Sequence, residues 1–395
     1  MTTENDMSAV YRELRAAQPY NLSEVARDAL IAHTAARGVE LLLADYALTV
    51  LRPVLDPPGP GTPEIRIDSS EPGRVFASQQ PLWDEERDTL HLPMTASGER
   101  LGVLCVRLPS PARTAQVEEL RELACTLAAA LWGAGRVTDR YRRARRSSRL
   151  TLAAEMQWEL LPGYGHRGGR YEIAGQLEPA YAVHGDNFDW SCEHDSLTLS
   201  ITNGMGEGLR AALLTSLAVT AIRNARRSGA DLVEQAGLAD EAVHAQYGGR
   251  EHVSTLLLRF DAVTGELAAV EAGSPRMIRL RGNDVDTVKL DAQLPLGMFG
   301  TTGYTEQPIA LRPGDRLVIV SDGVYGARSP AAVEFGETLL ESTVRSTRLQ
   351  PAGEAVRTIV RDMLAFRAVG DVVDDAVVVC LDWAAAGADP SRPLP

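Results

Sequence analysis

The stretch "LSITNGMGEGLRAALLT", residues 199–215, decides how the second half of the chain is interpreted. An apolar run leads to Asn203, alternate glycines follow, and apolar and small residues at helical spacing begin at once. Glycine-rich turns between a strand and a helix commonly present groups to a ligand. Asn203 is a neutral amide, so two alternatives stay open: a metal or phosphate site whose acid is missing, or a structural turn. A dinucleotide site is disfavoured, because the glycines follow G-x-G-x-G rather than G-x-G-x-x-G.

The composition is that of a globular protein. The chain has 395 residues, of which 45% are apolar and 24% charged, and this length predicts two or three domains. A net charge of −13 argues against nucleic acid or an anionic membrane as the main partner. The sequence contains no run of about 18 apolar residues, and its start has no signal-peptide pattern. Four well-separated cysteines disfavour a disulfide framework or a zinc site, so we expect a cytoplasmic protein.

The pattern of apolar residues predicts a chain in successive parts. Residues 1–135 read as helix, antiparallel strands and helix, which indicates an α+β domain. Residues 136–162 carry seven arginines followed by an apolar stripe, and predict a connecting signalling helix, whose pairing with a second copy would form a homodimer. Residues 163–385 are rich in strands and predict two antiparallel sheets flanked by helices, an α/β/β/α sandwich. We expect residues 386–395 to be a disordered tail.

Acidic residues recur at the predicted strand ends of this second half. Asp186 and Asp189 lie in "HGDNFDW", Asp322 ends the strand in "VIVSDGV", and Asp374 and Asp375 precede the last strand in "VVDDAVVVCL". Hard divalent cations bind several carboxylate oxygens, so acids from neighbouring strands could form one site. Each acid alone is more often a turn residue. The metal-site hypothesis therefore depends on their combination.

The order of these motifs resembles the PPM family of metal-dependent protein serine/threonine phosphatases, in its bacterial SpoIIE-type branch. The resemblance covers about residues 150–383, beginning with "AAEMQWELLP". The motifs that follow in family order are "HGDNFDW", "TNGMGEGLRAALLT", "EAGSPRMIRL", "LPLGMF", "LVIVSDGVYGARSP" and "DDAVVV". Six motifs in sequence make the resemblance specific, whereas a single glycine turn would not.

The resemblance implies both a fold and a site. It implies a β-sandwich between helical layers, with Asp186, Asp322 and Asp374 as metal ligands and the Gly204 carbonyl as a further one. Two manganese or magnesium ions would activate a water molecule that attacks phosphoserine or phosphothreonine, and catalysis would act through the bound metals. No covalent intermediate and no histidine are implied, and His184, beside the first motif, is expected to be structural.

One position departs from the family pattern. In this branch the residue before Gly-Met-Gly is an aspartate that bridges both metals, and here it is Asn203. An amide oxygen can bind one hard cation but bridges two poorly. We therefore expect one metal position to be weak or absent, unless Asp189 or Asp375 replaces the missing charge. Two functions remain: a phosphatase acting on a phosphorylated regulatory protein of the anti-anti-sigma type, or a pseudophosphatase that binds a phosphoprotein without turnover.

The first half resembles GAF-type sensor domains more weakly. The resemblance rests on "GRVFASQQPLW", "LHLPM" and "GERLGVLCVRLP", none of which is specific for a ligand. A domain of this type would control the activity of the second half. His91 and Cys105 are candidate binding residues, although the cysteine is more simply interpreted as a buried residue of the hydrophobic core.

Overall fold

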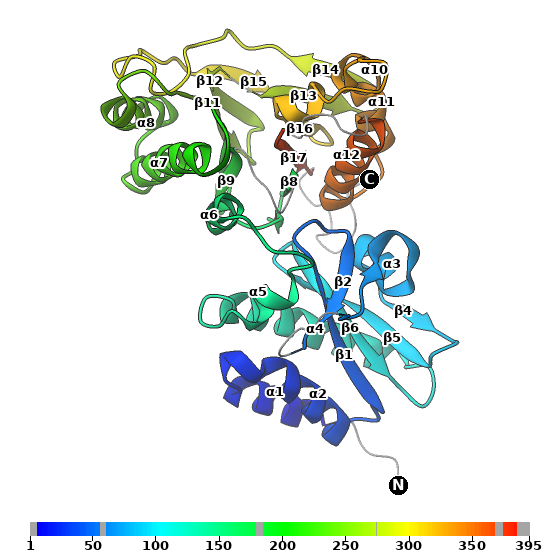
Figure 1. Cartoon of the computed structure of the whole chain (residues 1–395). Helices are drawn as coiled ribbons and strands as arrows, with labels where there is room; N and C mark the ends of the chain where they lie inside the picture. Colours follow the sequence, from blue (N-terminus) through cyan, green and yellow to red (C-terminus); the bar gives the residue numbers. More distant parts are fainter. Residues whose placement is uncertain (1–5, 56–60, 179–184, 274, 368–373, 385–395) are drawn as a thin grey trace. The chain divides into compact units, whose positions relative to one another are not determined.

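The computed structural model describes residues 6–55, 61–178, 185–273, 275–367 and 374–384, and is drawn in Figure 1. The chain divides into two compact units, Met1–Arg149 and Leu150–Pro395. The expected tail at 386–395 and His184 lie outside the described residues. Every helix within the described ranges is too short or too polar to traverse a bilayer.

The first unit is built on one antiparallel sheet with the strand order β3-β2-β1-β6-β5-β4. Its strands are β1 (Gly38–Ala44), β2 (Val50–Pro53), β3 (Ile65–Arg66), β4 (Leu82–Asp84), β5 (Thr89–Ala96) and β6 (Glu99–Arg107). Its helices are α1 (Met7–Ala16), α2 (Leu22–His33), α3 (Glu71–Ser78), α4 (Thr114–Ala134) and α5 (Arg140–Ala144). This unit therefore has the helix, strand and helix order that the sequence predicts.

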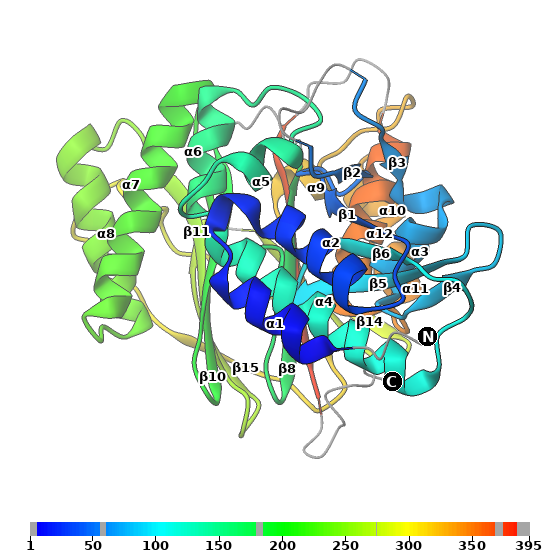
Figure 2. The same cartoon turned by 90° about the horizontal axis from the view of Figure 1, so that it is seen from below.

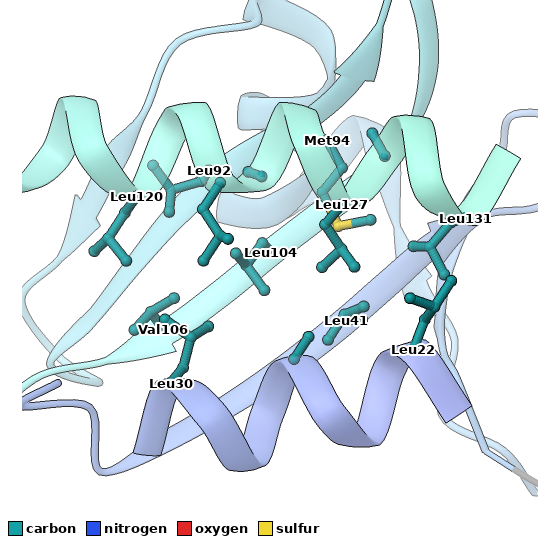
Figure 3. Close-up of a cluster of buried hydrophobic side chains, with 14 of the residues drawn as sticks. Leu22, Leu30, Leu41, Leu92, Met94, Leu104, Val106, Leu120, Leu127 and Leu131 are labelled. Atoms are coloured by element: carbon teal, nitrogen blue, oxygen red, sulfur yellow. The ribbon is translucent and has the colours of Figure 1, made fainter. Parts of the chain in front are cut away.

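Leucine-rich faces of α2 and α4 pack on one face of this sheet (Figure 3). Leu41 of β1, Leu92 of β5 and Leu104 of β6 contribute to the same buried cluster. Side chains alternate between the two faces of a strand, so the residues next to these leucines turn to the opposite face of the sheet. That opposite face carries polar side chains, among them His91 and Cys105.

The predicted connecting helix is not continuous. Helix α4 ends at Ala134, α5 is short, and α6 (Leu152–Leu160) begins separately. Between α5 and α6 the chain is held to the first unit, because buried Arg145 donates from Nε to the Ala44 carbonyl oxygen at 2.9 Å. Thr151 then caps α6 by accepting a hydrogen bond from the Ala154 amide at 3.1 Å. The prediction of one helix over 136–162 is therefore wrong, and a dimer formed through it loses its basis.

The second unit contains two antiparallel sheets. One has the order β15-β12-β11-β10-β9 and the other the order β14-β13-β16-β17-β8-β7. The strands are β7 (Gly165–Arg167), β8 (Tyr171–Glu178), β9 (Asp186–Cys192), β10 (Ser196–Gly204), β11 (Val253–Asp261), β12 (Glu266–Ala272), β13 (Arg276–Arg281), β14 (Asp284–Val288), β15 (Gln307–Ala310), β16 (Arg316–Val320) and β17 (Ala376–Trp383). The helices besides α6 are α7 (Gly208–Arg227), α8 (Leu232–Tyr247), α9 (Asp322–Tyr325), α10 (Phe335–Thr338), α11 (Leu340–Ser346) and α12 (Ala352–Phe366).

The two sheets pack face to face between layers of helices. Phe260 of β11 makes edge-to-face contacts with Tyr171 of β8 and Trp383 of β17, with ring centroids 6.3 and 5.7 Å apart, so these aromatic residues join the sheets. Helices α7 and α8 pack on the outer face of the five-stranded sheet, and α12 packs on the outer face of the other (Figures 1 and 2). The predicted α/β/β/α sandwich, and with it the α+β fold class, is confirmed.

Candidate metal centre

Four of the predicted site residues lie at strand ends on one side of the sandwich. Asp186 begins β9 and Asn203 lies opposite it near the end of β10. Asp322 follows β16 in the other sheet, and Asp374 precedes β17, which pairs with β16. The two sheets meet here, because Asn203 donates a hydrogen bond from Nδ2 to Oδ1 of Asp322 at 2.6 Å. The predicted residues are therefore brought together by both sheets.

Asp186 is the buried centre of this group. It is only 2% exposed, and its Oδ2 has no hydrogen-bond partner. Burial raises the pKa of Asp186 well above its usual value, and the carboxylates of Asp375, Asp322 and Asp374 raise it further. Burial and the nearby Asp374 likewise raise the pKa of Asp322. The folded chain therefore holds several carboxylates close to one another.

The neighbouring acids Asp374 and Asp375 have different environments. Asp375 is buried, and its Oδ2 accepts hydrogen bonds from the backbone amides of Gly185 at 2.6 Å and Asp186 at 3.0 Å. Asp374 is exposed. Asp375 thus positions the turn that carries Asp186, whereas Asp374 is available to bind a cation. The positioning role of Asp375 was missed from the sequence, where its only signal is its place beside Asp374.

Gly185 and Gly204 bring the two strand ends into close contact. The Gly204 amide donates to the Gly185 carbonyl oxygen at 3.2 Å, and Thr215 Oγ1 of α7 donates to the same oxygen at 2.6 Å. A Cβ atom on Gly185 would lie 2.4 Å from the Gly204 carbonyl oxygen, and one on Gly204 would lie 2.2 Å from Thr215 Oγ1. The chain can approach this closely only because both residues are glycine. Thr215 was also not predicted, although it lies in the small-residue helix that follows the glycine turn.

Asp189 forms ion pairs with two arginines of α7. It is 2% exposed and forms ion pairs with Arg223 at 2.6 Å and Arg226 at 3.0 Å, both on α7. Arg223 also donates to the carbonyl oxygen of Leu160 at the end of α6. Asp189 is held by both arginines and Oδ2 of Asp375 by two backbone amides, so we do not expect either acid to move and supply the charge that Asn203 lacks.

The chemistry of the acidic group suits a hard cation. No three His, Cys, Asp or Glu side chains in the described part of the chain already stand in a metal-binding arrangement. The donors are nevertheless carboxylate oxygens, which manganese and magnesium prefer. The unpartnered Oδ2 of Asp186 and the mutual repulsion of Asp186, Asp322 and Asp374 are what a bound cation would relieve.

The second unit can now be compared with known proteins. Residues 193–384, which include Asn203, Asp322 and Asp374, match the family described as Stage II sporulation protein E (SpoIIE). This part of the chain belongs to the SpoIIE family. The matched residues begin after Asp186 and β9. Because β9 pairs with β10 along its length, we count β9 as part of the SpoIIE-type domain.

Individual relatives of the SpoIIE-type domain are distant. Protein IcfG of Synechocystis sp. is 22% identical over 231 residues, which cover 51% of this chain and 36% of IcfG. The structure of the RsbU and RsbW domains of Rv1364c from Mycobacterium tuberculosis is similar with a TM-score of 0.50 and 21% identity, covering 60% of this chain and 64% of that one. The SiaA-PP2C domain of Pseudomonas aeruginosa has a TM-score of 0.49 and 20% identity, covering 59% and 94%. The chain thus spans about a third of IcfG and under two thirds of the mycobacterial structure.

We expect the crowded acids of the SpoIIE-type domain to make its metal-free form sensitive to pH. Because the pKa of Asp186 is raised by folding, the folded state binds a proton more tightly than the unfolded state, and stability falls as the pH rises from about 3.9 through the raised pKa. Asp186→Asn removes this loss, so it should raise the free energy of unfolding at pH 8 in the presence of a chelator. The advantage should shrink toward acidic pH.

Urea unfolding at several pH values measures this difference. The exposed Asp284 of β14 gives a matched Asp284→Asn control, which should leave the pH dependence unchanged. Equal stability of Asp186→Asn and the wild type at pH 8 would contradict the proposed crowding.

Proposed function

We propose that the SpoIIE-type domain is a metal-dependent protein phosphatase that hydrolyses phosphoserine or phosphothreonine on a regulatory protein of the anti-anti-sigma type. The observation that carries the proposal is the buried Asp186, whose unpartnered Oδ2 lies where the ends of β9, β10, β16 and β17 meet. Acids gathered from both sheets of a sandwich, rather than from one loop, form a pre-organised site.

The proposal gives each residue a defined task. Asp186, Asp322 and Asp374 would hold a manganese or magnesium ion, with the Gly204 carbonyl as a further ligand. When bound, such an ion activates water and stabilises charge on a phosphoryl group. Asp375 keeps the Gly185–Asp186 turn in place through two amide hydrogen bonds, and Thr215 fixes the same turn from α7. The first unit, under this proposal, is the GAF-like sensor domain that controls the activity.

A pseudophosphatase is the second candidate, and one contact favours it. The Asn203 amide donates to Asp322, so it stabilises that carboxylate by a hydrogen bond rather than adding a metal-binding charge. A domain stabilised in this way could bind a phosphorylated partner without hydrolysing it. Phosphate release from a phosphoserine peptide with manganese present supports the enzyme, and peptide binding without release supports the pseudophosphatase.

We expect Asp322→Ala and Asp374→Ala each to abolish tight manganese binding while leaving the fold intact. Removing a carboxylate ligand takes away both a donor and a charge, and it also reduces the repulsion around Asp186, so the apo variants should be no less stable than the wild type. Isothermal calorimetry with manganese measures the affinity. Asp284→Ala on exposed β14 is the matched control. Unchanged affinity in both site variants would rule these residues out as ligands.

A further inference from the structure

The first unit contains a cavity of about 640 Å³ on the polar face of its sheet. Strands β1, β5 and β6 form its floor, and Ile65 and Pro72 lie at its side. It lies on the other face of these strands from the leucine cluster of α2 and α4, the cluster that Figure 3 shows. Its volume is in the range of small-molecule binding sites.

Strand register arranges the cavity's polar side chains in two rows. Cys105 of β6 pairs with His91 of β5 on one side and with Glu40 of β1 on the other. One row along, Arg107 pairs with Thr89 and with Gly38. Residues in such rows share one face of the sheet. The rows therefore place an imidazole, a thiol, a carboxylate and a guanidinium around one cavity.

His91 and Cys105, at the centre of the floor, are uncharged and can still form hydrogen bonds. His91 and Cys105 are 3% and 7% exposed, and His91 Nδ1 lies 3.2 Å from Cys105 Sγ. His91 Nε2 is buried without a hydrogen-bond partner, 3.7 Å from the Asp84 carboxylate. Burial lowers the pKa of His91 and raises that of Cys105, so the imidazole and the thiol are neutral at pH 7. A neutral thiol is a poor nucleophile, which argues for reversible binding rather than covalent chemistry.

The rim of the cavity carries an excess of positive charge. Arg87 and Arg107 line it and are exposed, and neither guanidinium has an ion-pair partner among the described residues. The Arg107 side chain crosses Gly38, where a Cβ atom would lie 3.1 Å from its Nη2. Glu40 is the one acid among the described lining residues, so two positive charges face one negative charge. A single anionic group would balance this difference.

We propose that the cavity binds a small organic monoanion with an apolar body. Its acidic group would lie between Arg87 and Arg107, because guanidinium groups bind carboxylates and sulfonates through charge-assisted hydrogen bonds. Its apolar body would contact Leu42 and Ile65. The site is separate from the acidic group of the SpoIIE-type domain, so the two proposals stand or fall independently.

Two fluorescent probes that differ only in charge test the site on the full chain. Anilinonaphthalene sulfonate carries one negative charge, and phenylnaphthylamine has the same aromatic body without it. We expect Arg87→Gln and Arg107→Gln each to weaken sulfonate binding at least tenfold, since each removes a charge-assisted hydrogen bond. Glu40→Gln should tighten sulfonate binding severalfold. None of the three should alter phenylnaphthylamine binding.

Arg121→Gln is the matched control. It makes the same chemical change on α4, a helix that packs on the other face of the sheet. It should leave both affinities unchanged. Equal effects on the two probes, or no effect of either cavity arginine on the sulfonate, would overturn the proposal. If an arginine variant lost its folded circular dichroism signal, the Glu40→Gln comparison would still decide, because only a charge-selective site predicts tighter binding there.

Discussion

Replacing Asn203 by aspartate is expected to raise manganese affinity, and with it phosphoserine hydrolysis, by about a hundredfold or more. Loss of a ligand charge in a partly buried site costs on the order of a few kcal/mol, by analogy with a broken buried ion pair. About 1.4 kcal/mol corresponds to a factor of ten. Asp189 and Asp375 are held by Arg223 and by the backbone amides of the Gly185 turn, so neither compensates in the wild type.

The same substitution should have the opposite effect on the metal-free protein. Asn203 now donates to Asp322 at 2.6 Å, and an aspartate there would replace this hydrogen bond with like-charge repulsion. In a chelator we therefore expect Asn203→Asp to lower the melting temperature, and in manganese to raise it. This change of sign reports on the metal centre without any measurement of turnover.

Two controls make the result decisive. Asn224→Asp changes the same group on the exposed last turn of α7; it should leave manganese affinity unchanged and shift the melting temperature by the same amount in chelator and in manganese. Because Asn203 precedes a glycine, mass spectrometry must show that the wild type has not deamidated. If intact wild type hydrolyses phosphoserine as fast as Asn203→Asp, the missing acid does not matter and the pseudophosphatase is excluded.

Removing Asp189 is expected to cost about 3–5 kcal/mol of folding stability, because Arg223 and Arg226 would lose their buried partner. The two arginine side chains are 19% and 14% exposed, so water replaces the lost carboxylate only in part. Arg223 also donates to the carbonyl oxygen of Leu160, so the contact between α6 and α7 should loosen with it. Equilibrium urea unfolding of Asp189→Ala measures the loss.

Asp195→Ala provides the comparison in the turn between β9 and β10. Asp195 pairs with His194, but its side chain is 47% exposed and that of His194 is 94% exposed. Exposed ion pairs contribute about 0–1 kcal/mol, so this variant should unfold close to the wild type. If both variants lost a similar free energy of unfolding, the buried ion pairs of Asp189 would not contribute the expected stability.

The strands and the acids of the site could be predicted because their signals are local. Strands such as β10 and β16 read as short apolar runs that end in polar residues, and Thr264-Gly265 is a turn pair typical of the hairpin that joins β11 and β12. Asp322 and Asp374 stand at strand ends in the sequence as they do in the fold. A family resemblance supplied the pairing of these ends across two sheets, which local patterns do not contain.

The roles of adjacent acids could not be predicted because they depend on long-range contacts. Asp374 and Asp375 are adjacent aspartates that local sequence cannot tell apart. Only the hydrogen bond from the Gly185 amide identifies Asp375 as the positioning residue and leaves Asp374 as the candidate ligand. Asp189 likewise reads as a second metal acid until α7 brings Arg223 and Arg226 against it. Such differences appear only when segments far apart in the chain pack together.

Two helical segments differ from what local sequence signals alone indicate. The signal for helix α8 is weak because Gly237 interrupts an alanine-rich segment, although the Asp231 cap and the left-handed Gly248 are recognisable end signals. The connecting helix was predicted too long because arginine favours helices, whereas Arg145 binds the Ala44 carbonyl and the chain leaves the helix there. Tertiary contacts overrode local propensity in the second case.

The position of β17 also constrains how the SpoIIE-type domain is made. It comes last along the described chain, yet it lies inside its sheet between β16 and β8, with Asp374 and Asp375 directly before it. On the ribosome, β8 and β16 therefore emerge before the strand that joins them, and one edge of each stays unpaired meanwhile. A nascent chain cannot assemble the acidic group until Asp374 and β17 have been synthesised, so the candidate metal centre is among the last parts of the domain to form.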